Sequence, residues 1–316
     1  MDIIQKIHQR ASQKRATIVL PRSSDPRVIE AAQYLIQNQL CKVILIHEAD
    51  EIPYPEGSEV IIPEQASYFD EFASLLHEKR KHKGLTLEQA TSLIKDPLYF
   101  AAMMVAQSKA DGCVAGSVST TGDVLRAAIQ VIGLKPGSSV VSSTFMMSFD
   151  DGRVFTYGDC AVVPYPDANQ LASIAIDSAA THTALTGEVS NVALLSFSTK
   201  GSATHERIQL VQEALTAARS TKPDLHIDGE LQFDAALLES IGQRKAPGSP
   251  VAGQANVFIF PNLDAGNIAY KITERLAGAT ATGPVIQGLA KPMMDLSRGC
   301  SWQDIVNTAC VSALMS

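Results

Sequence analysis

Short apolar runs alternate with amphipathic segments along most of the chain. Thr17–Leu20 is an apolar run that ends at Pro21 and is typical of a short buried strand. Pro26–Asn38 follows a polar entry and carries apolar residues at helical spacing, as does Thr204–Ser220, so both predict helices. The other predicted strands are Lys42–Ile46, Gly112–Ala115, Val140–Ser143, Val192–Leu195, Leu225–Ile227 and Val257–Phe260.

This alternation of strands and helices predicts parallel α/β layers. The chain has 316 residues, which exceeds what one hydrophobic core usually spans, so we expect two domains. A segment rich in Gly, Ser and Asp, Lys135–Asp151, marks the clearest composition shift and the expected boundary.

Composition and charge narrow the class of protein. The net charge of −7 and the 19% charged residues do not favour a nucleic-acid or anionic-membrane partner. The longest uncharged run, Ala246–Leu263, contains three prolines and cannot be a membrane-spanning helix. The five cysteines form no Cys-x-x-Cys pair, and Met1–Gln13 does not resemble a signal peptide. We therefore expect reduced thiols and a cytoplasmic location.

The segment with the most unusual mixture of side chains is Asp295–Asp304. It contains a hydroxyl, a guanidinium, a thiol and a carboxylate, in Ser297, Arg298, Cys300 and Asp304. Because Arg298 lies between Ser and Gly, its backbone is free to turn. Its planar guanidinium can then point toward a phosphate or toward negative charge that develops on an oxygen. The mixture indicates group transfer with an anionic substrate.

Structural interpretations of the same segment remain open. Ser301–Asp304 reads as a capping box at the start of the last helix, and the helix dipole would weaken Asp304 as a base. Cys300 beside a glycine is either a packing residue or an acyl-carrying nucleophile.

A second candidate loop is Gly116–Asp123, which follows a predicted strand and precedes a helix. Open α/β sheets bind ligands at such loops, and its hydroxyls and amides can surround a phosphate. The alternative is a capped turn with Thr120 as N-cap and Arg126 paired to Asp123.

Two further segments carry positive charge. The basic run Lys79–Lys83 closes a helical segment, where cations are also favoured by the helix dipole. Thr199–Ala203 is a loop with one cation and two hydroxyls. P-loop, serine-hydrolase and Rossmann signatures are absent, and the one close histidine pair, His77 and His82, has no metal-ligand spacing, so we expect no bound metal.

Seven segments, in one order along the chain, match the sequence pattern of a known family: Arg80–Gly84, Thr121–Arg126, Ser198–Ala203, Ile227–Gln232, Lys245–Gly253, Asn256–Lys271 and Gln287–Ser301. By these segments the chain resembles the phosphotransacetylase (phosphate acetyltransferase) family along essentially its whole length. The resemblance implies reversible transfer of an acetyl group between coenzyme A and inorganic phosphate. It also implies two three-layer α/β domains similar to the isocitrate and isopropylmalate dehydrogenases, an active site in the interdomain cleft, and a homodimer. We expect domains of residues 1–145 with 296–316, and of residues 146–295.

The resemblance also implies residue roles. Ser297 and Arg298 match the family's acyl-stabilising residues, and Asp304 matches its catalytic base. The expected substrate-binding residues are Arg80, Arg126, Ser119, Thr120, Thr121, Lys200, Gly201 and Ser202. Coenzyme A is expected as a substrate, with no tightly bound cofactor, and direct transfer through a ternary complex is the expected mechanism.

Some features leave alternatives open. Ala127 stands where many members of the family have proline, and Ser119 stands near a position where histidine is frequent. These departures concern the acyl-chain preference, so a phosphate propionyltransferase or butyryltransferase is an alternative. A non-catalytic domain that senses acetyl-CoA is a second alternative of another class.

Overall fold

A computed structural model describes residues 3–316. The chain divides into two compact units, one formed by the described residues up to Gly133 together with Leu289–Ser316, and the other by Leu134–Gly288. The boundaries expected from the sequence are 145/146 and 295/296. The positions differ because Ser142–Ser148 pairs within the second sheet and Met293–Asp295 pairs within the first.

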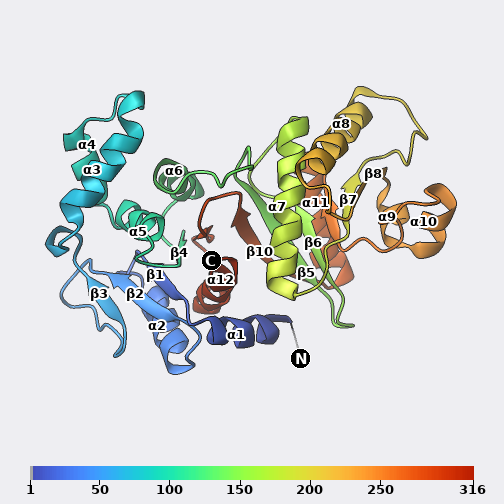
Figure 1. The fold of residues 1–316 in the computed structure, drawn as a ribbon. Coiled ribbons are helices and arrows are strands. Elements are labelled where there is room, and N and C mark those ends of the chain that lie inside the picture. Colours follow the sequence, from blue (N-terminus) through green and yellow to red (C-terminus); the bar gives the residue numbers. More distant parts are fainter. Residues whose placement is uncertain (1–2) are drawn as a thin grey trace. The chain divides into compact units, whose positions relative to one another are not determined.

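The first unit is built on a five-stranded sheet in the order β11-β4-β1-β2-β3, and every pair of neighbouring strands is parallel (Figure 1). Its strands are β1 (Thr17–Leu20), β2 (Lys42–Ile46), β3 (Glu59–Ile61), β4 (Gly112–Ala115) and β11 (Met293–Asp295). Parallel strands with helical crossovers bring all their carboxyl ends to one edge of the sheet.

Helices cover both faces of this sheet. On one face α12 contacts α1, α2 and strands β1, β4 and β11, while α5 and α6 contact the sheet from the other face (Figure 1). The helices of the first unit are α1 (Ile3–Lys14), α2 (Pro26–Gln37), α3 (Phe69–Arg80), α4 (Leu87–Ile94), α5 (Pro97–Ala106), α6 (Thr121–Val131) and α12 (Trp302–Met315), with short 3-10 turns η1 (Pro63–Gln65) and η2 (Lys81–Lys83).

The second unit contains a six-stranded sheet in the order β10-β5-β6-β9-β7-β8. Strands β6, β9, β7 and β8 pair in parallel, and β10, β5 and β6 pair antiparallel. The strands are β5 (Ser142–Ser148), β6 (Val154–Gly158), β7 (Val192–Leu195), β8 (Ile227–Leu231), β9 (Val257–Ile259) and β10 (Thr280–Gln287). The prediction of two α/β domains with mainly parallel sheets is thus confirmed.

The central strands β7 and β9 are buried on both faces, which explains why they read as unbroken apolar runs. Val192 and Leu194 of β7 pack into one hydrophobic core, and the alternating Ala193 and Leu195 pack into another. Helices α7 (Ala168–Thr186) and α8 (Glu206–Thr221) cover the first core, and α11 (Leu263–Ala277), α9 (Phe233–Leu237) and α10 (Glu239–Lys245) lie on the side of the second.

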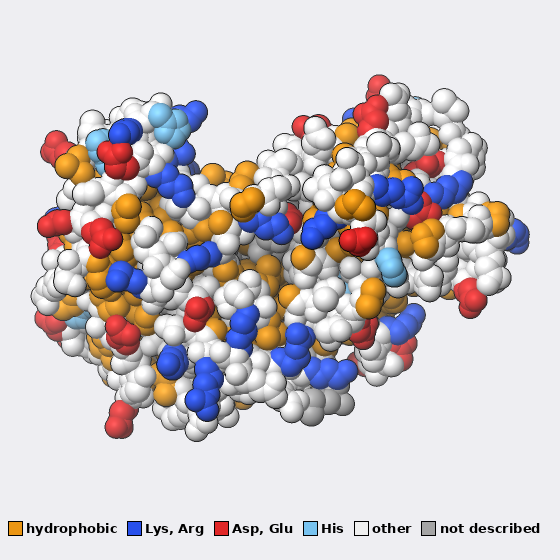
Figure 2. All heavy atoms as spheres, in the orientation of Figure 1, with side chains coloured by type: hydrophobic (Ala, Val, Ile, Leu, Met, Phe, Trp, Pro, Cys, Tyr) orange, Lys and Arg blue, Asp and Glu red, His pale blue; other side chains and the backbone are white. Residues whose placement is uncertain are grey.

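Charged side chains of both signs are interspersed on the face shown in Figure 2. This distribution accords with the moderate net charge of −7. Within residues 3–316, no helix is both long enough and apolar enough to cross a bilayer.

Candidate active site

Two loops begin side by side at the carboxyl edge of the first sheet. Asp295, the last residue of β11, is paired in register with Ala115, the last residue of β4, and the Leu296 amide donates to the Ala115 carbonyl at 2.9 Å. Gly116 follows at φ +97°, and a Cβ atom there would lie 2.2 Å from the Leu296 carbonyl oxygen. Glycine is therefore required for the loops 116–120 and 296–301 to start in contact.

The side chain of Arg27, in the first turn of α2, joins these two loops. Its Nη1 donates to the carbonyls of Arg298 at 2.9 Å and Cys300 at 2.7 Å, and its Nη2 donates to the Ser117 carbonyl at 2.9 Å. The planar guanidinium suits this arrangement because it presents several donors in a rigid fork. Arg27 thereby fixes the backbone on both sides of the site.

Asp25 holds Arg27 in place. The carboxylate of Asp25 accepts from Nη2 of Arg27 at 2.8 Å and from Nε at 3.0 Å, and it also caps α2 by accepting from the Arg27 amide at 3.0 Å. Burial alone would raise the pKa of Asp25, but hydrogen bonds from Arg27 and Ser117 hold it below its usual value. No local sequence pattern singles out this pair, although Asp25 lies only five residues after the predicted strand Thr17–Leu20.

Ser297 and Arg298 are exposed at the tip of the second loop. The Ser297 hydroxyl accepts from the Gly299 amide at 3.2 Å, which leaves its proton free to donate. Within the described part of the chain, the Arg298 guanidinium makes no hydrogen bond or ion pair, while its carbonyl is held by Arg27. The backbone of Arg298 is therefore fixed and its charge is available.

Asp304 forms the predicted capping box at the start of α12. Its Oδ2 accepts from both the amide and the hydroxyl of Ser301 at 2.8 Å, and its amide donates to the Ser301 hydroxyl at 3.2 Å. The side chain is exposed, and Oδ1 makes no hydrogen bond among residues 3–316. One oxygen therefore caps the helix while the other can accept a proton.

Cys300, between these residues, is buried, and burial raises the pKa of its thiol. A buried thiol with a raised pKa is a poor nucleophile. This favours the interpretation of Cys300 as a packing residue.

Asp295 is the least expected feature of the site. Its side chain is only 2% exposed, and Oδ1 has no hydrogen-bond partner among the described residues. Burial raises its pKa to about 6, an effect that a hydrogen bond from Thr121 partly offsets. A carboxyl group of this kind lies at the base of the loop that carries Ser297 and Arg298.

The first loop leads into α6 and brings several predicted residues together. Thr120 is the N-cap, and its hydroxyl donates to Asp123 Oδ2 at 2.7 Å and accepts from the Asp123 amide at 3.2 Å. Arg126 donates to Asp123 Oδ1 at 2.7 Å, and the Ser119 hydroxyl accepts from Arg22 Nε at 3.4 Å. The capped-turn interpretation is therefore confirmed, and the exposed Thr121 and Arg126 remain accessible to a ligand.

The residues of the basic run Lys79–Lys83 make different contacts. Lys79 Nζ caps the carboxyl end of α6 through the carbonyls of Val131 at 2.6 Å and Ile132 at 2.9 Å. Arg80 makes no side-chain hydrogen bond or ion pair within the described chain, but it lies close enough to Tyr99 to influence its pKa. Burial raises the pKa of Tyr99, and the charges of Arg126 and Arg80 both lower it. The two arginines therefore share one neighbourhood in the first unit.

The remaining predicted residues lie in the second unit, in the loop after β7. Lys200 Nζ forms an ion pair with the buried Asp228 at 2.5 Å and donates to the Gly229 carbonyl at 2.8 Å. The Gly201 amide donates to Glu230 Oε1 at 2.7 Å. Ser202 accepts from the Thr199 amide at 3.0 Å, so these three residues already have partners in the loop's own network.

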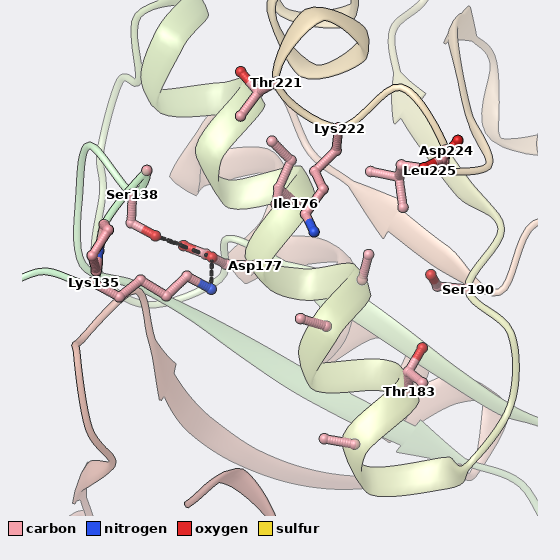
Figure 3. A pocket seen from close by; sticks show the side chains of 15 residues that line it. Lys135, Ser138, Ile176, Asp177, Thr183, Ser190, Thr221, Lys222, Asp224 and Leu225 are labelled. Carbon is pink, nitrogen blue, oxygen red and sulfur yellow. Dashed lines mark hydrogen bonds and ion pairs between the residues drawn. The ribbon is translucent and has the colours of Figure 1, made fainter.

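The second unit also contains a cavity of about 780 Å³ between α7, the end of α8 and the segment 135–138 (Figure 3). Asp177 lies at its wall, paired with Lys135 and accepting from the Ser138 hydroxyl at 2.8 Å. None of the residues expected to bind substrate lines this cavity. Across residues 3–316, no group of three His, Cys, Asp or Glu side chains is placed to hold a metal ion.

Comparisons with known proteins agree with this fold. Over its whole length the chain is 47% identical to the full length of a phosphate acetyltransferase from Thermoanaerobacterium thermosaccharolyticum. A solved phosphotransacetylase from Streptococcus pyogenes is 39% identical, with a TM-score of 0.93 over 99% of this chain and 97% of that one. The solved 4-hydroxythreonine-4-phosphate dehydrogenase from Klebsiella pneumoniae is only 10% identical but shares the fold. Its TM-score is 0.52, over 96% of this chain and 98% of that one.

These similarities define an α/β acyltransferase. The chain belongs to the phosphate acetyl/butaryl transferase family, whose model matches residues 2–313.

The Arg27 contacts generate a testable prediction. In Arg27→Lys the charge remains, but a single ammonium cannot reach three carbonyls and Asp25 together, so at least one carbonyl loses its donor. We expect the free energy of unfolding to fall by about 1–3 kcal/mol. Amide hydrogen exchange in residues 116–120 and 296–301 should become faster.

The matched control is Arg153→Lys, since Arg153 is an exposed arginine whose hydrogen bonds go to Asp151. Arg153→Lys should change neither the free energy of unfolding nor the amide hydrogen exchange in residues 116–120 and 296–301. Unchanged exchange in both loops of Arg27→Lys would show that Arg27 does not hold them.

Proposed function

We propose that this chain is a phosphate acetyltransferase, which moves an acetyl group reversibly between coenzyme A and inorganic phosphate. The observation that carries the proposal is the placement of Ser297 and Arg298 on an exposed loop at the carboxyl edge of a parallel sheet, with Asp304 in the first turn of the helix that follows. Full-length identity of 47% to a curated phosphate acetyltransferase supports the same reaction.

Asp304 is the proposed base. A thiol with a pKa near 8.5 is only a few per cent ionised at neutral pH, so a positioned proton acceptor assists its attack. Asp304 Oδ1 takes the proton of the coenzyme A thiol, while Oδ2 keeps its hydrogen bonds to Ser301. Those bonds hold the carboxylate in one orientation during the transfer.

Arg298 and Ser297 stabilise the transition state. The thiolate sulfur attacks the acetyl carbonyl of acetyl phosphate, and negative charge develops on the carbonyl oxygen. The free guanidinium of Arg298 and the hydroxyl of Ser297 donate to that oxygen; one such donor is commonly worth about 3 kcal/mol. The carbon–oxygen bond to phosphate then breaks, and phosphate leaves with the electron pair.

The phosphate end of the substrate lies at the start of α6. Arg80 and Arg126 supply positive charge, and the free amides of the helix N-terminus favour an anion. Ser119, Thr120 and Thr121 add hydroxyl groups beside them. Since both substrates are then held together, transfer proceeds directly within a ternary complex.

Lys200, Gly201 and Ser202 are proposed to contact the substrates through their exposed surface. Because Asp228 already pairs with the Lys200 ammonium, this loop contributes less positive charge than Arg80, which has no acidic partner within residues 3–316. No cysteine of the chain takes part in the proposed reaction, since all five cysteines are free and buried.

We also propose that the protein is a cytoplasmic homodimer. Helix α11 carries three exposed apolar side chains, Ile268, Ile272 and Leu276, and Leu276 is 84% exposed. Their spacing of four residues places them on one face of the helix. An exposed apolar stripe of this kind is typical of an interface, and a second copy of the chain is the proposed partner. The free cysteines support a reducing compartment.

Arg298→Ala tests the catalytic proposal. Thioester formation from acetyl phosphate and coenzyme A should fall by at least about 10²-fold, because a donor to the developing oxyanion is lost. The Tm should not change, since the Arg298 side chain makes no contact that stabilises the described fold. Arg244→Ala, at another exposed arginine, serves as the control and should keep full turnover. Turnover of Arg298→Ala within about threefold of the wild type would contradict the assigned role.

Leu276→Glu tests the dimer. Light scattering after size exclusion should give twice the chain mass for the wild type and a single chain mass for the variant, because a buried charge in the interface would be unpaired. Leu87→Glu, at a half-exposed leucine of α4, should remain dimeric. A wild-type monomer, or a Leu276→Glu dimer of unchanged affinity, rules out this interface.

A further inference from the structure

The cavity beside α7 has no role in the proposed reaction. Its volume of about 780 Å³ lies within the range of pockets that hold small organic molecules. All its lining residues belong to the second unit, and none is proposed to bind a substrate. Helices α7 and α8 cover one face of the second sheet and α11 lies on the other, so the proposed dimer contact on α11 does not cover the cavity.

One end of the cavity carries a cation without a partner. Lys222 directly follows α8, and its amide donates to the Ala218 carbonyl at 2.8 Å. Its side chain extends toward α7, and its ammonium makes no hydrogen bond or ion pair within the described chain (Figure 3). The side chain of Asp224 is directed away from α7, and Asp177 already pairs with Lys135. The charge of Lys222 is therefore available to an anion.

The other end of the cavity carries two hydroxyl groups without partners. Ser190 is only 9% exposed, yet its hydroxyl makes no hydrogen bond within the part of the chain that the structure describes. The hydroxyl of Thr183, on α7, points toward Ser190 and likewise has no hydrogen-bond partner there (Figure 3). Buried polar groups are as a rule hydrogen-bonded, and the cavity is where a partner can reach the Ser190 hydroxyl.

Apolar side chains line the space between these two ends. Ile176, Ala180 and Ala184 follow one another at intervals of four residues, so they lie on one face of α7. Leu225 faces them from the segment after α8 (Figure 3). The small alanine side chains leave the space open, and an occupant meets apolar carbon along its middle.

We propose that this cavity binds a small organic anion with an apolar body and a polar group at its far end. The acidic group of the ligand pairs with Lys222, its body lies against Ala180 and Leu225, and its polar end bonds to Ser190. A few placed polar groups in a mainly apolar lining are what gives such pockets their specificity. The ligand is a molecule other than coenzyme A and phosphate, and its binding does not depend on the proposed reaction.

Three matched probes test this assignment by calorimetric titration of the full chain. The probe 3-(4-hydroxyphenyl)propionate carries a carboxylate, an apolar ring and a hydroxyl group. The second probe, 3-phenylpropionate, lacks the hydroxyl, and the third, 4-ethylphenol, lacks the carboxylate. We expect the first to bind with a Kd below about 1 mM and the other two to bind about threefold to tenfold more weakly, because each lacks one polar contact.

Two variants assign the two ends of the probe. Lys222→Ala should weaken binding of both carboxylates about threefold to tenfold and leave 4-ethylphenol unchanged. Ser190→Ala should weaken both phenols by a similar factor and leave 3-phenylpropionate unchanged. The matched control is Lys6→Ala, at an exposed lysine of α1 that also has no partner within residues 3–316, and it should change none of the three.

A third variant closes the cavity. Ala180→Phe places a large side chain in the space that the probes would occupy, so all three should bind at least about tenfold more weakly. Ala180 and Lys222 are both exposed, so their variants keep the test valid if Ser190→Ala does not fold.

The assignment is overturned if no probe binds up to about 10 mM. Binding that Ala180→Phe and Lys222→Ala both leave unchanged would place the probes elsewhere and would equally overturn it. Competition between the probes and coenzyme A for the wild type would show that the probes occupy the proposed substrate site, and this result also rejects the assignment.

Discussion

The candidate site depends on the interaction between Arg27 and the backbone of two loops. A single guanidinium donates to the carbonyls of Ser117, Arg298 and Cys300, and Asp25 holds that guanidinium from the opposite side. Each loop alone is a short, partly exposed segment with few internal hydrogen bonds. Because Arg27 satisfies carbonyls of both, it joins the two loops, and α2 fixes the backbone next to the Arg298 side chain.

Burial of Asp295, at the same edge of the first sheet, lowers the free energy of unfolding when its carboxyl group is ionised. Asp295 is buried with its pKa raised to about 6 from 3.8, so its ionised form is less favourable in the folded chain. This cost is absent below about pH 4, grows as the pH rises through the interval up to 6, and reaches about 3 kcal/mol above it. Local costs of this size are characteristic of functional positions, where the surrounding structure compensates for them.

The sequence predicts the regular parts of this fold well because local pattern determines them. The predicted strands Thr17–Leu20, Lys42–Ile46, Gly112–Ala115 and Val192–Leu195 match the observed bounds. Strand β10 was missed because its pairing with β5 is antiparallel and its residues are mostly not buried on both faces. The four adjacent residues Ser301–Asp304 predict a capping box, and the structure confirms it. The Arg27 contacts span more than 270 positions to Cys300, and no local pattern encodes such a contact.

The central claim is that the two loops pass the acetyl group directly from phosphate to the thiol of coenzyme A, without an acyl-enzyme. The most direct test incubates the purified chain with acetyl phosphate and isotopically labelled inorganic phosphate, with and without coenzyme A. Direct transfer predicts that label enters acetyl phosphate only when coenzyme A is present, since the reverse reaction then regenerates it. Exchange of label in the absence of coenzyme A would reveal an acyl-enzyme intermediate and contradict the account.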